Sequence, residues 1–184
     1  QGKLEDTAFP DDLKNQVGKL VAQFKNSGPV YYLYGTDSAG KQALVEAVCA
    51  DLNVPLLYIE AEKLMEADTT PEITPRLIFR EGCLQNAAIY LDGIQGLAGD
   101  GKGNKSLYKN LITGLSHYPH WVFVSGDRDV QLKGISGNKP CFNVEVSASA
   151  YPERRRIWEK AIQSRDKPAP DVNLSDIAGK FKFT

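Results

Sequence analysis

One stretch decides the fold of this chain: Val30-Tyr31-Tyr32-Leu33-Tyr34-Gly35-Thr36-Asp37-Ser38-Ala39-Gly40-Lys41-Gln42. Residues 30–34 are a short aromatic and β-branched run, which predicts a buried strand. Apolar residues recur at helical spacing over 41–52, which predicts a helix. The residues between follow the pattern GxxxxGK, which is typical of a phosphate-binding loop when a strand precedes it and a helix follows. Both conditions hold, so the stretch predicts a phosphate site at the end of a strand.

The chemistry of this loop follows from its residue types. Gly35 and Gly40 permit backbone angles and a close approach to a ligand that a side chain would block. Successive N–H groups can then point into one concavity, the helix N-terminus adds partial positive charge, and Lys41 can reach the outer phosphates. We therefore expect eight residues to bind a nucleotide: Gly35, Thr36, Asp37, Ser38, Ala39, Gly40, Lys41 and Gln42. The alternative is a glycine-containing turn with Lys41 in solvent.

Position 42 departs from the usual motif. A phosphate loop of this kind normally ends in Ser or Thr, whose hydroxyl coordinates Mg²⁺. Gln42 offers an amide oxygen on a longer arm, which fits the tight octahedral geometry of magnesium poorly. Nucleotide can still bind through backbone amides and Lys41, but we expect weaker positioning of a metal.

A second candidate residue ends another apolar run. Asp92 follows the strand-like residues 87–91 and would contact Mg²⁺ indirectly, through water. In phosphate-loop ATPases with a catalytic base, a Glu follows this Asp, whereas this chain has Gly93, which can accept no proton. An Asp that merely ends a strand is the alternative interpretation.

A third candidate is Ser125, which follows the predicted strand 121–124. A small polar side chain at the end of the strand beside the phosphate loop can orient water or a γ-phosphate oxygen. The alternative is a serine that ends a strand and starts a turn. Asp92 and Ser125 are therefore the candidate catalytic residues, and Asp92 is also the candidate metal contact.

Strand-like and helix-like segments alternate along the chain. The predicted strands are 30–34, 55–59, 87–91, 121–124 and 142–146, and the predicted helices are 11–24, 41–52, 74–86 and 106–118, with two more starting at 152 and 173. Thr74 and Ser106 are the expected N-caps of their helices, and 99–104 is an expected loop. Apolar strands alternating with helices indicate an α/β fold with a parallel sheet covered on both faces. Such a sheet binds ligands at the carboxyl ends of its strands.

Composition limits the function classes. The 22 Lys and Arg nearly balance the 23 Asp and Glu, which gives no general reason to bind nucleic acid or an acidic membrane. The three cysteines form no CxxC pair and lie in apolar runs, so we expect buried free thiols in a reducing compartment. No apolar run approaches ~20 residues and the start lacks a signal-peptide pattern, so we expect a soluble, cytoplasmic protein.

Taken together, these elements resemble the large subdomain of an AAA+ ATPase. The resemblance covers about 9–184 and rests on the phosphate loop, the strands that end in Asp92 and Ser125, and a fifth strand followed by 151–158. It implies a three-layer αβα P-loop NTPase fold, a five-stranded parallel sheet ordered 5-1-4-3-2, and ATP at the loop. It also implies an N-terminal linker and helix in 1–28 and a nucleotide-binding subdomain in 29–184, truncated where the helical lid would begin.

A narrower resemblance rests on two runs, Phe79-Arg80-Glu81-Gly82-Cys83-Leu84-Gln85-Asn86-Ala87-Ala88-Ile89-Tyr90-Leu91-Asp92-Gly93 and Val122-Phe123-Val124-Ser125-Gly126-Asp127. They are similar to the degenerate first AAA domain of bacterial tandem-AAA winged-helix ATPases, which are often associated with contractile injection systems. Several family features are missing. Residues 131–140 hold no arginine for the finger unless Arg128 serves, and 64–68 lack the aromatic residue of a polypeptide-threading loop.

These observations favour an AAA+ nucleotide-binding module with weak or absent ATP hydrolysis. Loss of a general base costs about 10²–10⁴-fold, and loss of an arginine finger about 10³–10⁵-fold. The expected ligands are ATP and, less well held, Mg²⁺, and the expected partners are other AAA+ domains or subunits, with no membrane and no nucleic acid. The alternatives are an active ATPase completed by a partner subunit, a purely structural interaction domain, and a small P-loop kinase. The last would need an Arg-rich lid and an acceptor-binding carboxylate, and the sequence has neither.

Overall fold

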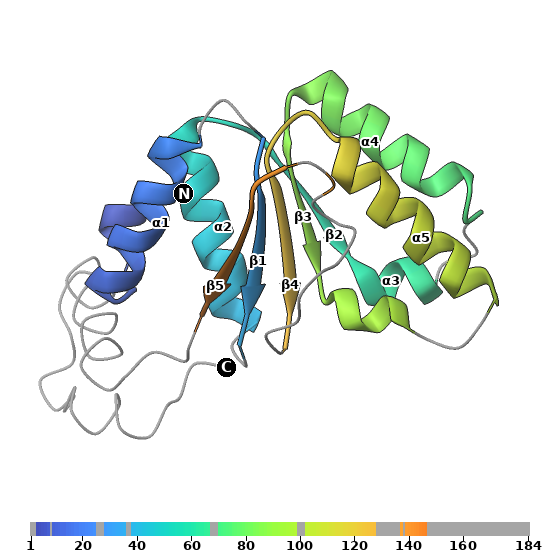
Figure 1. Ribbon diagram of the computed structural model, residues 1–184, viewed down its shortest axis with the longest axis horizontal. Helices are drawn as coiled ribbons and strands as arrows, with labels where there is room; N and C mark the ends of the chain where they lie inside the picture. Colours follow the sequence, from blue (N-terminus) through green and yellow to red (C-terminus); the bar gives the residue numbers. More distant parts are fainter. Residues whose placement is uncertain are drawn as a thin grey trace, which may run out of the picture.

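The computed structural model describes residues 3–7, 9–24, 28–35, 38–66, 70–98, 102–127, 137 and 139–146. Of residues 38, 39, 65, 66, 98 and 102–104 it describes the backbone alone. The described residues form one five-stranded sheet with helices on both faces (Figure 1). The predicted α/β class with three layers is therefore confirmed.

The sheet is entirely parallel. Its strands are β1 (Val30–Tyr34), β2 (Leu56–Glu60), β3 (Ala88–Asp92), β4 (Val122–Gly126) and β5 (Cys141–Glu145). Their spatial order is β2-β3-β4-β1-β5, which is the predicted order 5-1-4-3-2 read from the other side. All four neighbouring pairs run parallel, so every strand ends at the same side of the sheet, which we call the carboxyl edge.

Helices form the two outer layers (Figure 1). They are η1 (Leu4–Asp6), α1 (Asp11–Gln23), α2 (Ser38–Leu52), α3 (Ala61–Glu66), α4 (Ile73–Gln85), η2 (Ile94–Ala98) and α5 (Lys102–His117). The helices α1 and α2 cover one face of the sheet, and α3, α4 and α5 cover the other.

The strand residues alternate between two buried clusters, as the pleat of a strand requires. Tyr31 and Tyr90 point to the α1 and α2 face, where Leu13 and Val17 of α1 join them. On the other face the cluster contains strand residues such as Val30, Tyr32, Ile89 and Leu91, and the α5 residues Leu107, Leu111 and Leu115. Burial of apolar surface on both faces stabilises the sheet and holds its carboxyl edge in place.

The division of the chain into a linker and helix (1–28) and a nucleotide-binding subdomain (29–184) stays a prediction.

Three expected helix starts were wrong, and one of them is that of α2, which begins at Ser38 rather than at residue 41. Helix α5 begins at Lys102, inside the segment predicted as a loop, and Ser106 is an internal residue whose Oγ donates to Glu72 Oε1 at 3.3 Å. Helix α4 begins at Ile73, with Glu72 rather than Thr74 at the N-cap position, and no side chain caps it. Apolar periodicity locates a helix, but its first turn depends on which backbone N–H groups find partners. The Thr74 N–H donates to Thr70 O, so Thr74 is already inside the helix and cannot be its N-cap.

Three other expectations needed correction. The short elements α3 and η2 were not predicted, because each spans six residues or fewer and carries little periodic signal. Strand β4 runs on through Ser125 to Gly126, so Ser125 lies within the strand rather than after it. The cysteines are free as predicted, but only Cys49 is buried, whereas Cys83 and Cys141 are exposed.

Some predicted features lie outside the described residues. These are the helices expected from 152 and 173, the segment 151–158, the candidate finger Arg128, and nearly all of 131–140. Within the described part of the chain, no helix is both long and apolar enough to cross a membrane.

Candidate nucleotide site at the carboxyl edge

The predicted phosphate loop connects β1 to α2, as the motif requires. Helix α2 begins at Ser38, so Gly40, Lys41 and Gln42 lie in its first turns. Thr36 and Asp37 lie outside the described residues, as do the side chains of Ser38 and Ala39. Gly35 has φ +134°, and a Cβ there would lie 2.1 Å from Val146 O just beyond β5. Only glycine therefore fits where the chain leaves β1.

Lys41 is buried at the start of this helix, with 1% of its surface exposed. Its Nζ donates to Gly35 O at 2.6 Å and to Gly126 O at 2.9 Å. A buried ammonium group needs such partners, because leaving its N–H groups unpaired away from water is costly. The alternative of a lysine in solvent is therefore wrong. The side chain lies between the ends of β1 and β4, at the carboxyl edge.

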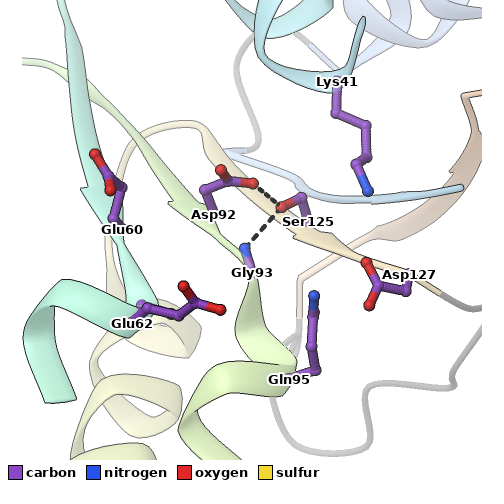
Figure 2. Close-up of a pocket in the computed structure, with 9 residues that line it drawn as sticks. Lys41, Glu60, Glu62, Asp92, Gly93, Gln95, Ser125 and Asp127 are labelled. Carbon is purple, nitrogen blue, oxygen red and sulfur yellow. Dashed lines mark hydrogen bonds between the residues drawn. The ribbon is translucent and has the colours of Figure 1, made fainter. Parts of the chain in front are cut away.

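Asp92 is the centre of a hydrogen-bond network, which we call the Asp92 network. Its Oδ1 accepts from Tyr90 OH at 2.9 Å and from Ser125 Oγ, and its Oδ2 accepts from Tyr58 OH at 3.0 Å. The Ser125 oxygen also accepts from Gly93 N–H at 2.9 Å. Figure 2 shows the connection from Asp92 through Ser125 to Gly93. Two predicted candidates, Asp92 and Ser125, are thus bonded to each other.

Strand register brings the Asp92 network together. In the β2–β3 pair Tyr58 lies opposite Tyr90 and Glu60 opposite Asp92, so tyrosines 58 and 90 share a face with Asp92. Tyr58 is 36% exposed, but partial removal of its hydroxyl from water and the nearby Asp92 carboxylate still raise its pKa well above its ordinary value. Burial, more than that carboxylate, raises the pKa of Tyr90 as well. Both phenols therefore remain protonated donors to Asp92 at neutral pH.

Lys41, Asp92 and Ser125 line one pocket of about 180 Å³ (Figure 2). Its other described lining residues are Glu60, Ala61, Glu62, Gly93, Gln95 and Asp127. The described lining thus carries four carboxylates and one cation, Lys41. Glu60 is already paired with Lys63, with 2.7 Å between Oε1 and Nζ.

Sequence reasoning did not identify Glu60, Glu62, Gln95 or Asp127 as site residues. A signal for two of them was present, because Glu60 is the last residue of β2 and Asp127 follows β4 directly. Both therefore lie at the carboxyl edge, where ligands of such sheets bind. Glu62 and Gln95 lie on the unpredicted elements α3 and η2, so no periodic pattern indicated them.

Gln42 lies apart from the described lining of this pocket. Its side-chain Nε2 donates to Glu46 Oε1 at 2.9 Å, one turn further along α2. Among the described residues, no group of three or more His, Cys, Asp or Glu side chains could hold a metal ion.

Comparison with known proteins identifies the fold. No protein-family model and no curated protein sequence matches this chain. Among solved structures, it is similar to the crystal structure of the FIGL-1 AAA domain, with a TM-score of 0.74 and 16% sequence identity. The match covers 96% of this chain and 65% of that one. The chain therefore has the fold of an AAA domain, over about two thirds of the length of that relative.

Proposed function

We propose that this chain is an AAA+ nucleotide-binding module with weak or absent ATP hydrolysis, acting as a binding or regulatory part of a larger ATPase assembly. The observation that carries the proposal is the meeting of Lys41, Asp92 and Ser125 in one pocket. They come from three different elements, α2, β3 and β4, and in an AAA fold this edge is where a nucleotide's phosphates would lie. The similarity to an AAA domain supports the same placement.

The chemistry of the pocket favours weak hydrolysis. Gly93 follows Asp92 where a catalytic Glu would stand, and the loss of a general base costs about 10²–10⁴-fold. Ser125 gives its only O–H to Asp92 and cannot also orient a water molecule by donation. ATP turnover by this chain alone should therefore stay far below roughly 1 s⁻¹, a rate that is itself at the low end for typical enzymes.

The wider role is proposed from the resemblance. Other AAA+ domains or subunits are the expected partners, and the cytoplasm is the expected location. The narrower resemblance of two sequence runs to the degenerate first domain of tandem-AAA winged-helix ATPases suggests an assembly in which a second, intact AAA domain performs the hydrolysis.

Calorimetric titration of ATP and ADP tests nucleotide binding. We expect Lys41→Met to abolish nucleotide binding, because it removes the charge. Methionine preserves much of the buried volume, so the variant should still fold. The matched control is Lys139→Met, since Lys139 also donates to two backbone carbonyls, those of Leu115 and Tyr118, but does not line the pocket. Equal binding by both variants would contradict the proposed role of Lys41.

A purely structural domain is the second candidate, and one observation favours it. Both Lys41 and Asp92 already have partners within the protein. If folded wild-type protein binds neither ATP nor ADP, the structural domain is the only candidate that remains. Steady-state turnover near 1 s⁻¹ would instead favour an active ATPase.

A further inference from the structure

A magnesium ion in this fold would need groups that the pocket does not offer. In P-loop NTPases the ion is held by the Ser or Thr that ends the phosphate loop and by an Asp elsewhere in the chain. The corresponding residues here are Gln42 and Asp92. Neither is placed as that ion requires.

Gln42 is held away from the pocket. Its amide nitrogen donates to Glu46 Oε1, which directs the end of the side chain along α2. A hydroxyl at this position would be short enough to stay beside the β-phosphate, whereas this longer side chain bonds one turn further along its own helix. The first metal ligand of the usual site is therefore missing.

Asp92 is largely occupied by protein donors. A carboxylate has about four acceptor positions. Tyr58, Tyr90 and Ser125 fill three of them with hydroxyl groups. A metal-bound water that displaced Tyr90 or Ser125 would leave a buried hydroxyl group without a partner, so only the more exposed Tyr58 could be replaced at low cost. The second metal contact is therefore weakened as well.

A third phosphate also finds little in this pocket to bind it. The O–H of Ser125 is directed to Asp92, and its oxygen accepts from Gly93 N–H, so Ser125 has no proton for a γ-phosphate oxygen. The carboxylates of Glu62 and Asp127 line the same space, and Figure 2 shows Glu62 extending toward Gly93 and Gln95. Lys41 is the one cation of the described lining, so the carboxylates outnumber it and repel the additional charge of a triphosphate.

We infer that this site binds nucleotide without Mg²⁺ and holds ADP at least as tightly as ATP, because Asp92 accepts hydrogen bonds from hydroxyl groups in place of metal-bound water. This inference rests on the proposed nucleotide binding. Lys41 and the N–H groups at the start of α2 hold the inner phosphates, and the rest of the pocket gives the third phosphate no favourable contact. As a regulatory module, such a site stays loaded whether or not ATP is hydrolysed elsewhere.

The test compares the affinities of ADP and ATP for the wild-type chain in EDTA and in Mg²⁺. We expect Mg²⁺ to tighten neither nucleotide by more than about threefold, and ATP to bind no tighter than ADP in EDTA. Tightening of ATP by Mg²⁺ beyond about threefold would overturn the inference, because ordinary coupling between two ligands is about 5–150-fold. Tighter binding of ATP than of ADP in EDTA would overturn it as well.

A second arm restores the metal site. The variant Gln42→Thr combined with Tyr58→Phe supplies the loop hydroxyl and releases one oxygen of Asp92. We expect its ATP affinity to rise about tenfold on addition of Mg²⁺. The control is Tyr108→Phe, a tyrosine on α5 outside the described lining of the pocket, which should leave the wild-type pattern unchanged. If the double variant is folded but indifferent to Mg²⁺, these two residues are not what excludes the ion, and the inference falls.

The two proposals fail in different ways. If folded wild-type protein binds neither nucleotide in either buffer, the proposed function fails. If both nucleotides bind only with Mg²⁺, the proposed function stands and the inference about the metal is wrong.

Discussion

At the scale of single residues, the site depends on positions where one side chain, or none, fits. Gly35 lets the chain turn from β1 into the phosphate loop beside Val146, and Ser125 joins β4 to the Asp92 network. Each role comes from a close contact across neighbouring strands. Substitutions at these positions should therefore affect folding as well as binding.

Gly35→Ala should destabilise the protein. A new Cβ would lie 2.1 Å from Val146 O at a φ of +134°, so both overpacking and backbone strain oppose it. We expect the free energy of unfolding to fall by about 3 kcal/mol, measured by chemical denaturation. Gly18→Ala is the matched control, because nothing lies within 4 Å of a Cβ there and the residue is inside α1. The free energy of unfolding of Gly18→Ala should rise by about 0.5–1 kcal/mol. Equal effects of the two substitutions would contradict the packing argument.

Ser125→Ala removes the connection between β4 and β3. The Gly93 N–H would lose its acceptor and Asp92 one donor, and Ser125 is 1% exposed. We expect a loss of about 1–3 kcal/mol in the free energy of unfolding. Ser116→Ala, on the surface of α5, should change it by less than about 0.5 kcal/mol. If Ser125→Ala leaves the free energy of unfolding unchanged, the Asp92 network does not stabilise the fold.

At the scale of elements, the face that a helix or strand buries decides how its residues react. Cys49 lies on the buried side of α2, whereas Cys83 on α4 and Cys141 on β5 are exposed. Apolar neighbours in the sequence predicted that all three would be buried. Apolar neighbours do not define which side of a helix or strand a particular cysteine occupies.

The thiols should therefore differ in reactivity toward a disulfide reagent. Burial raises the pKa of Cys49 to about 12, and partial removal of the thiol from water raises the pKa of Cys141, although that residue is exposed. At pH 8 we expect Cys83 to react first, Cys141 more slowly, and Cys49 only after unfolding, as followed by thiol release in native and denatured protein. Because the raised pKa belongs to the folded state, the contribution of Cys49 to stability should be lost as pH rises from about 9 toward 12. Fast modification of all three thiols at pH 8 would contradict this burial pattern.

At the scale of the whole molecule, the carboxyl edge collects side chains from distant parts of the chain. Lys41 donates to Gly126 O, 85 residues away in the sequence. Asp92 joins β2, β3 and β4 through its hydroxyl donors. A ligand bound at this edge therefore contacts several elements and should stabilise the molecule as a unit.

Nucleotide should raise the thermal stability in the absence of metal. At a free ADP concentration 100 times the dissociation constant, binding adds about 2.7 kcal/mol. For a domain of this size, each kcal/mol shifts the melting temperature by roughly 2–4 °C. A thermal-shift series in EDTA should therefore show a clear rise for wild type and Lys139→Met, and none for Lys41→Met. A rise for Lys41→Met of the same size would place the nucleotide away from Lys41.

Much of the fold was predictable from local patterns. The five strands, the phosphate loop between β1 and α2, and the polar residues at the ends of β3 and β4 follow from hydrophobic periodicity and motif spacing, because these depend on neighbouring residues. The strand order came from the resemblance to AAA+ proteins rather than from any local signal. The starts of α2, α4 and α5 were missed because the first turn of a helix depends on partners for its N–H groups.

The amino-acid sequence alone determined the alternation of strands and helices and the presence of a glycine-rich loop followed by Lys41. Only the tertiary structure decided what Lys41 and Asp92 contact. Tyr58 meets Asp92 because β2 pairs with β3 in a register that places Glu60 opposite Asp92, and Lys41 reaches Gly126 because β4 lies beside β1. Strand pairing joins residues far apart along the chain, and the free energy that selects it comes from burial over the whole sheet rather than from any one segment.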